Sequence, residues 1–507
     1  MDLQHTTRNV GSLESVFDQK LEQPVDGDIT LPEYCPDILR IIKTTMEPAV
    51  YAVQSANERA TVEGAARVTV LYSAEDGTLQ SFEQSYPFSR AVDMLGLEDG
   101  AAVTAAVKTE FINGRAVSQR RIDCHGMMSI HMRARRKRED AVLTEVIGGG
   151  IQTLGDTIRV SSLEALQAAT FSLNEVLEID PDAPPVDQVI LRQAVVVPSE
   201  VKAIKNKLLV KGNVETRVVY RSRGTSTPVQ VLHVMPMSQI IEAPGVSEAT
   251  ENTLRMRVNS LEVTPKADAN GAARLLEITA RIGADVRGYA PVELVVVKDA
   301  YSTQGGVLPE MRRLETRRLA ESFRETFLAK ESFDFGAQGI ERVLLLGHEV
   351  LPPEVLVKED TLRGNGKIKF YVVFEDSDGN LAVADKELGY GFQRALKGDE
   401  NVMADVEVEL LSVQESVSGG QLEIRTELVA FGEVFVAESR SVVGNVVQDD
   451  GDAIPQRAPL TIYFASDGEP LWEIAKRYRT TMDAVRQENE LASDVAQSGQ
   501  MLLIPSV

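Results

Sequence analysis

Apolar and polar residues alternate along much of the chain. Three stretches start near a glycine and then place apolar side chains at every second position: EGAARVTVLY from Glu63, KGNVETRVVY from Lys211 and RGNGKIKFYV from Arg363. A period of two residues is typical of a β-strand with one buried face. We therefore predict a strand in each stretch, with Val70, Val218 and Phe370 directed into a core.

The three stretches belong to a longer repeat. Gly64, Gly212 and Gly364 open the copies, 148 and 152 residues apart. Each copy has a turn dipeptide after its strand: Asp76-Gly77, Arg223-Gly224 and Asp378-Gly379. Each copy also has a last strand with two inward apolar residues: Ile122/Cys124, Leu276/Ile278 and Leu422/Ile424. Because such turn dipeptides supply the positive φ of a tight hairpin, we predict three tandem antiparallel β-rich modules.

The segments between the modules have other patterns. The segment VLPEMRRLETRRLAESFRETFLAKE has helical spacing at Leu314, Leu319, Phe323 and Phe327, and predicts a connecting helix before the third module. Gln448 to Arg457 is polar and acidic and contains Gly and Pro, which is typical of a flexible linker. The fold class is thus mainly β. The predicted domains are 1–140 with an N-terminal lead, 141–308, 309–447 with the connecting helix, a linker at 448–458, and a small module at 459–507.

Composition and charge narrow the classes of function. Hydrophobic residues make up 43% and charged residues 25%, as in soluble globular proteins. The net charge of −23 repels phosphate backbones and anionic lipids, so we expect no nucleic-acid partner. The N-terminus has no basic region followed by an apolar core, and no stretch resembles a membrane span. We therefore expect a cytoplasmic protein without a signal peptide or a transmembrane segment, and two cysteines agree with a reducing compartment.

Candidate chemistry is sparse. Cys35, Cys124 and His125 show no CxxC or HxxxH spacing, and Cys124 takes an inward strand position, so we expect no metal site. The basic run ARRKR from Ala134 is consistent with contact to an anionic membrane or nucleic acid, but a charge-balanced surface segment fits the acidic chain better. No nucleophile elbow or zincin motif is present, so we expect no catalytic residue and no cofactor. A hydrolase built on the β modules is the alternative from the enzyme class.

The C-terminal residues resemble a LysM module. The segment IYFASDGEPLWEIAKRYRTTMDAVRQENELASDVAQSGQMLLIP, from Ile462 to Pro505, matches the family pattern of a strand, a GDTLW-like turn, IAxxY, NxL and PGQxLxIP. The resemblance implies a βααβ fold in which residues 462–464 pair with residues 502–504. The second helix, Met482 to Glu490, is predicted to start after Thr480-Thr481, and either threonine can cap it.

The resemblance also indicates a binding site. Glycan-binding LysM modules form a sugar groove from the GDT turn and the loop before PGQ. Here the turn is Gly468-Glu469-Pro470, so a threonine hydroxyl is lost, and Pro470 has no N–H to offer a sugar. We therefore expect the patch to bind a protein, with peptidoglycan as the alternative ligand. The patch residues are Gly468, Glu469, Pro470, Leu471, Trp472, Val495, Ala496 and Gln497.

The segment ITLPEYCPDILRII, from Ile29 to Ile42, resembles the opening of the SPOCS domain of spore-coat and spore-envelope proteins. SPOCS modules joined to a LysM module resemble a family of clostridial spore-envelope assembly proteins. This resemblance implies a non-enzymatic scaffold for coat morphogenesis, located in the mother cell at the forespore surface. It implies that the LysM module docks to the coat-basement ATPase, stage IV sporulation protein A. A peptidoglycan-binding protein associated with the cell wall is the alternative.

Overall fold

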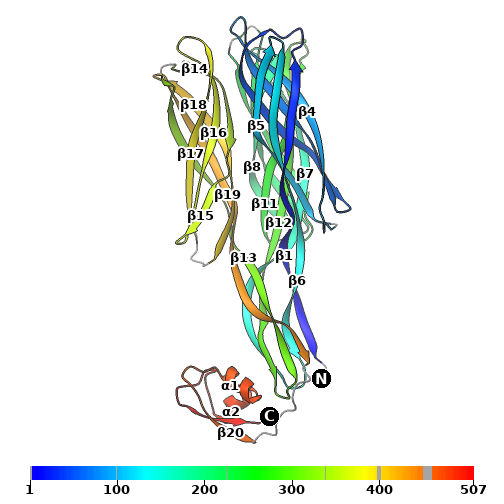
Figure 1. Cartoon of the computed structure of the whole chain (residues 1–507), viewed down its shortest axis with the longest axis vertical. Coiled ribbons are helices and arrows are strands. Elements are labelled where there is room, and N and C mark those ends of the chain that lie inside the picture. Colours follow the sequence, from blue (N-terminus) through cyan, green and yellow to red (C-terminus); the bar gives the residue numbers. More distant parts are fainter. Residues whose placement is uncertain are drawn as a thin grey trace.

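The computed structural model describes residues 3–98, 100–223, 225, 227–336, 339–396, 401–448 and 459–506. Three β units follow one another in the chain, and a small module with two helices ends it (Figure 1). In each unit the first and last strands are long and continue beyond the rest of the unit as a twisted ribbon. The small module lies beside the far end of these ribbons (Figure 1).

The first β unit, residues 4–147, packs two antiparallel sheets face to face. One sheet has the order β1-β6-β5 and the other β2-β3-β4. The strands are β1 (Gln4–Thr30), β2 (Ile38–Ala56), β3 (Arg59–Ala74), β4 (Leu79–Asp93), β5 (Ala102–Ser118) and β6 (Arg121–Ile147). One apolar cluster, which includes Val70, Ile122 and Cys124, lies between the two sheets.

The second β unit, residues 151–302, repeats this plan with sheets β11-β12-β7 and β10-β9-β8. Its strands are β7 (Ile151–Glu178), β8 (Gln188–Ile204), β9 (Lys207–Arg221), β10 (Val229–Glu242), β11 (Glu251–Ala267) and β12 (Ala273–Ser302). The third β unit, residues 307–448, has the sheet β13-β19-β18 and a second sheet in which β14, β15 and β17 all pair with β16. Its strands are β13 (Val307–Asp334), β14 (Arg342–Val350), β15 (Glu354–Lys358), β16 (Thr361–Glu375), β17 (Leu381–Ala395), β18 (Val402–Ser418) and β19 (Gln421–Gln448). Two short strands replace one long strand here because Pro352 and Pro353, between β14 and β15, cannot donate to the ladder.

The predicted inward positions are confirmed. Val70, Val218 and Phe370 are 0%, 0% and 1% exposed. The last-strand pairs are buried as well: Ile122/Cys124, Leu276/Ile278 and Leu422/Ile424. The mainly β fold class is therefore correct.

The predicted alignment of the third copy was off by two residues. All three units share a bulge between their first two paired strands, at Ile42, Ile190 and Leu344. In each unit, the residue just before this bulge pairs with an aromatic residue of the next strand, which is Tyr72, Tyr220 or Phe374. Phe374 of the third unit therefore corresponds to the two tyrosines. A slip of two keeps every side chain on its own face of the sheet, which is why the core prediction survives the error.

The predicted connecting helix is wrong. Its residues form β13, which pairs with β19 over its whole length. Leu314 packs against the long strands of the other units, Leu319 against Leu163 and Tyr289, and Phe323 inside the third unit. Because a twisted ribbon meets successive neighbours on different sides, its apolar residues fall at irregular intervals that resemble helical spacing.

The remaining sequence features have mixed outcomes. Gly77 and Gly379 adopt positive φ of 79° and 81° in their turns, as predicted, whereas Gly224 lies outside the described residues. Residues 449–458 of the predicted linker also lie outside them, and the domain limits stay predictions. The basic run lies on β6, where Arg136 pairs with Glu14 at 2.6 Å and Arg138 with Asp140 at 3.1 Å.

The C-terminal module has the βααβ order that the resemblance implied. Its elements are β20 (Leu460–Phe464), α1 (Leu471–Tyr478), α2 (Met482–Glu488) and β21 (Met501–Pro505). Ile462 pairs with Leu503 in an antiparallel ladder. Thr481 caps α2 by accepting a hydrogen bond from the Ala484 amide at 3.0 Å, as one of the two predicted caps.

Phe370 gives a direct test of the repeat core. The variant Phe370→Ala should lower the free energy of unfolding by about 3–5 kcal/mol, because it leaves a cavity among fully buried side chains. Leu356→Ala is the matched control in the same unit, since the Leu356 side chain is 61% exposed. Urea titration of both variants measures the change. A loss below about 1 kcal/mol for Phe370→Ala would show that this face is not core.

Candidate functional site

Glu469, in the turn before α1, is held by the module itself. Its carboxylate accepts hydrogen bonds from the Ser466 amide at 3.0 Å and from the Tyr463 hydroxyl at 2.8 Å. Arg477 lies 3.3 Å from the same carboxylate. The Ser466 amide, together with Tyr463 and Arg477, keeps the pKa of Glu469 below its usual range. Glu469 therefore stabilises the turn and offers a ligand little free hydrogen-bonding capacity.

The two loops of the predicted groove bind each other. Pro470 and Val495 form an isolated antiparallel bridge. On its two sides the Leu471 amide donates to the Asp494 carbonyl at 2.8 Å, and the Ala496 amide donates to the Glu469 carbonyl at 2.9 Å. These backbone donors are therefore satisfied within the module. A sugar would have to compete with existing hydrogen bonds at this place.

The predicted patch is only partly accessible. Gly468, Pro470, Val495 and Gln497 are exposed, Val495 at 48%. Three other patch residues are buried at 5% exposure or less: Leu471, Trp472 and Ala496. Leu471 and Ala496 belong to the core of the module, as does Trp472, whose ring also meets β12 of the second unit. The structure thus brings the two predicted loops together but leaves a small surface that is centred on Pro470 and Val495.

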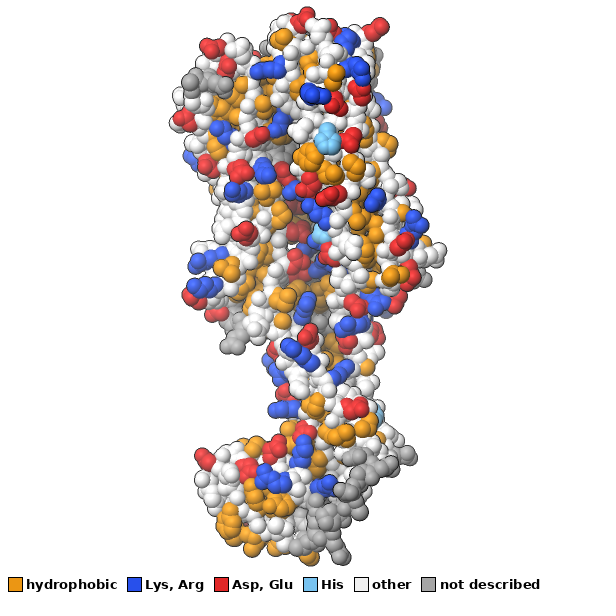
Figure 2. Space-filling view, in the orientation of Figure 1, with side chains coloured by type: hydrophobic (Ala, Val, Ile, Leu, Met, Phe, Trp, Pro, Cys, Tyr) orange, Lys and Arg blue, Asp and Glu red, His pale blue; other side chains and the backbone are white. Residues whose placement is uncertain are grey.

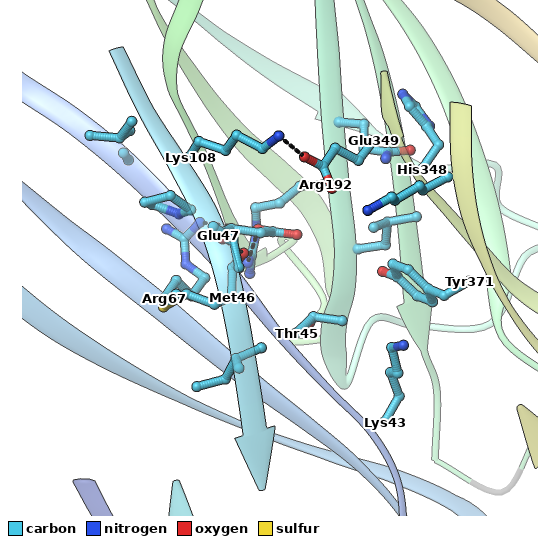
Figure 3. A pocket seen from close by; sticks show the side chains of 18 of the residues that line it. Lys43, Thr45, Met46, Glu47, Arg67, Lys108, Arg192, His348, Glu349 and Tyr371 are labelled. Atoms are coloured by element: carbon cyan, nitrogen blue, oxygen red, sulfur yellow. Dashed lines mark hydrogen bonds and ion pairs between the residues drawn. The ribbon is translucent and has the colours of Figure 1, made fainter. Parts of the chain in front are cut away.

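A cavity, separate from the patch on the C-terminal module, lies where the three units meet (Figure 3). It has a volume of about 920 Å³ and takes lining residues from β2, β5, β8, β14 and β16, among other strands. Two ion pairs connect the first and third units beside it: Lys43–Asp385 at 2.7 Å and Lys108–Glu349 at 2.9 Å. Figure 3 shows the Lys108–Glu349 pair, with His348 and Tyr371 on the side of the third unit.

The charges deeper in this cavity are shared between units. Arg192 of the second unit lies 2.8 Å from Glu83 of the first unit, and Arg67 of the first unit pairs with Glu262 of the second. Glu47 faces both arginines at 3.8 Å, and burial raises its pKa. Each guanidinium thus already has carboxylate partners, so the cluster connects the units. Sequence analysis missed this cluster because its members come from separate copies with no local motif.

Within the residues that the structure describes, no group of three or more His, Cys, Asp and Glu side chains is placed to hold a metal ion. Cys35 and Cys124 are both buried and neither is part of a disulfide, and burial raises the pKa of each thiol. A thiolate nucleophile is disfavoured at both positions. The described residues also include no helix with the length and apolar character needed to cross a bilayer.

The fold defines a β-rich repeat protein that ends in a LysM-type binding module. Comparison with known families identifies the domains. The family model described as "SipL, SPOCS domain" matches residues 37–116 and 185–266, and the LysM domain model matches residues 467–505. Neither a curated protein nor a solved structure matches the chain. The protein thus carries SPOCS segments in its first two units and a C-terminal LysM domain, both of which are non-catalytic binding domains.

The buried His348, beside the cavity, should make the stability of the fold sensitive to acid. Burial, and then the charge of Arg217, lowers the pKa of His348 from the ordinary 6.5 to about 4. The unfolded chain therefore takes up this proton at higher pH than the folded chain does. The stability that the neutral ring contributes is complete above pH 6.5 and is lost as the pH falls toward 4, by at most about 1.4 kcal/mol per pH unit.

The variant His348→Gln should therefore flatten the decline of the free energy of unfolding between pH 6.5 and 4. Urea titrations at several pH values in this window measure the slope. His5→Gln, at an exposed position of β1, is the control and should keep the slope of the parent chain. Equal slopes for His348→Gln and the parent would contradict a buried neutral histidine.

Proposed function

We propose that this protein is a non-enzymatic scaffold of spore-coat and envelope morphogenesis that docks to a protein partner through its LysM module. The SPOCS and LysM domains fit a sporulation-associated binding protein. We propose the mother cell, at the forespore surface, as its place of action. The partner we propose is the coat-basement ATPase, stage IV sporulation protein A.

The groove of the LysM module is the observation that carries this proposal. Its turn has a proline where the family pattern has a threonine, and its Glu469 carboxylate is engaged by Ser466 and Tyr463. The loop amides of Leu471 and Ala496 donate to each other's loops. Pro470 and Val495 leave an apolar surface exposed, next to the exposed Gly468 and Gln497. A small apolar surface with charged neighbours suits a protein partner better than a polar sugar.

Peptidoglycan is the second candidate ligand. The match to the LysM domain itself favours it, because LysM modules are associated with glycan-like ligands. The two candidates differ in the chemistry that they require from the groove. A glycan needs free donors and acceptors, whereas a protein can use apolar burial.

Binding assays with the full chain separate the candidates. The purified chain should capture the purified coat-basement ATPase and should remain in the supernatant with purified peptidoglycan. Deletion of residues 459–507 should leave the β units folded, since each has its own core, but should abolish capture and recruitment to the forespore. Far-UV circular dichroism verifies the fold of the deletion variant.

A single exposed residue tests the patch. The variant Val495→Asp places a charge on the apolar surface and should weaken ATPase binding by about tenfold or more. Glu488→Ala, at an exposed position of α2, is the matched control and should bind like the parent. Strong sedimentation of the parent chain with peptidoglycan, together with no ATPase binding, would reverse the assignment.

A further inference from the structure

The end of β12 contacts the LysM module through two side chains of the second unit. The Asp299 carboxylate accepts a hydrogen bond from Trp472 Nε1 at 2.8 Å, and its Oδ2 lies 2.5 Å from Lys476 Nζ. The Tyr301 ring lies edge-on to Trp472, with centroids 4.8 Å apart and an interplanar angle of 65°. The Tyr301 hydroxyl donates to the Thr480 carbonyl at 2.7 Å. Figure 1 shows this module beside the ends of the long strands.

This contact is buried on both sides. Trp472 is 5% exposed and Tyr301 6%, and the Asp299 side chain is 19% exposed. Burial raises the pKa of the Tyr301 hydroxyl to about 12. The Asp299 carboxylate thus accepts from the Trp472 indole N–H and pairs with the Lys476 ammonium group. The Tyr301 ring packs against the indole ring. Charge-assisted hydrogen bonds and an edge-to-face ring pair are stronger contacts than ordinary surface packing.

The three copies show that the contact is specific to the second unit. Their long strands share a bulge after Leu143, Val297 and Val443, which aligns the strand ends. Where the second unit has Asp299, the others have Glu145 and Asn445; where it has Tyr301, they have Ile147 and Val447. The fold itself therefore does not require an aromatic residue at this end.

We propose that Asp299 and Tyr301 form an internal seat for the chain's own LysM module. Seating holds the module against the second unit and covers the face that includes Trp472. A partner whose contact extends from the exposed Pro470 and Val495 onto Trp472 has to displace Tyr301, so the seat keeps the module in a closed state. The claim about the partner rests on the proposed docking function, whereas the seat itself does not.

The chain has one tryptophan, which makes the seat directly measurable. Acrylamide quenching of Trp472 fluorescence in the full chain reports its accessibility. The variants Tyr301→Ala and Asp299→Ala should raise the quenching constant by about twofold or more, because each removes contacts that cover the indole. Tyr301→Phe keeps the ring and should give a smaller rise. Ile147→Ala changes the equivalent end of the first unit, where the side chain is 52% exposed, and should leave quenching unchanged.

Capture of the coat-basement ATPase by the same full-length variants tests the closed state. Tyr301→Ala should capture more ATPase than the parent, and Ile147→Ala the same amount. Unchanged quenching in both seat variants, with the native fold verified by circular dichroism, would overturn the seat. Increased quenching without increased capture would overturn the closed state. If neither the parent nor any variant captures the ATPase, the proposed function fails, and quenching alone still decides whether the seat exists.

Discussion

The burial of one apolar surface shared by three sheets is the constraint on which the rest of the structure depends. Each β unit has its own core, and each also turns an apolar outer face toward the other two. Leu71, Val219 and Val373 occupy equivalent positions on β3, β9 and β16 and belong to one cluster. The bulge residues Ile42, Ile190 and Leu344 belong to the same cluster, because the extra residue lets an apolar side chain leave its own unit and reach the shared core. The units therefore pack around a common centre and do not form a simple string of domains.

Polar contacts around this centre are less regular, and they distinguish the three copies. The buried pair Arg287–Glu433, at 2.7 Å, joins the second and third units, whereas Arg192 and Glu83 join the second and first. Removing one partner of a buried pair leaves an uncompensated charge, so such pairs fix which unit lies beside which. The LysM seat is a further departure from the repeat, since Tyr301 is present in one copy. Three related units thus give a body with distinct sides.

The sequence predicts the strands well because one-sided burial produces a period of two, as around Val70 and Val218. It predicts the LysM fold through a long motif, although the motif alone does not show that Glu469 and the loop amides are already engaged. The ribbon β13 was predicted as a helix because its apolar residues contact three different neighbours in turn. The cavity, the ion pairs between units and the seat at Tyr301 depend on residues brought together from separate copies. No local pattern encodes such contacts, so they become visible only in three dimensions.

Scanning calorimetry of the chain without residues 459–507 tests the shared centre most directly. Units that share a core should unfold together, in one transition whose calorimetric enthalpy equals the van't Hoff enthalpy. Independent units would give separate transitions, or a calorimetric enthalpy about three times the van't Hoff value. The first result is the one that this structure predicts; the second would contradict a common core at Leu71, Val219 and Val373.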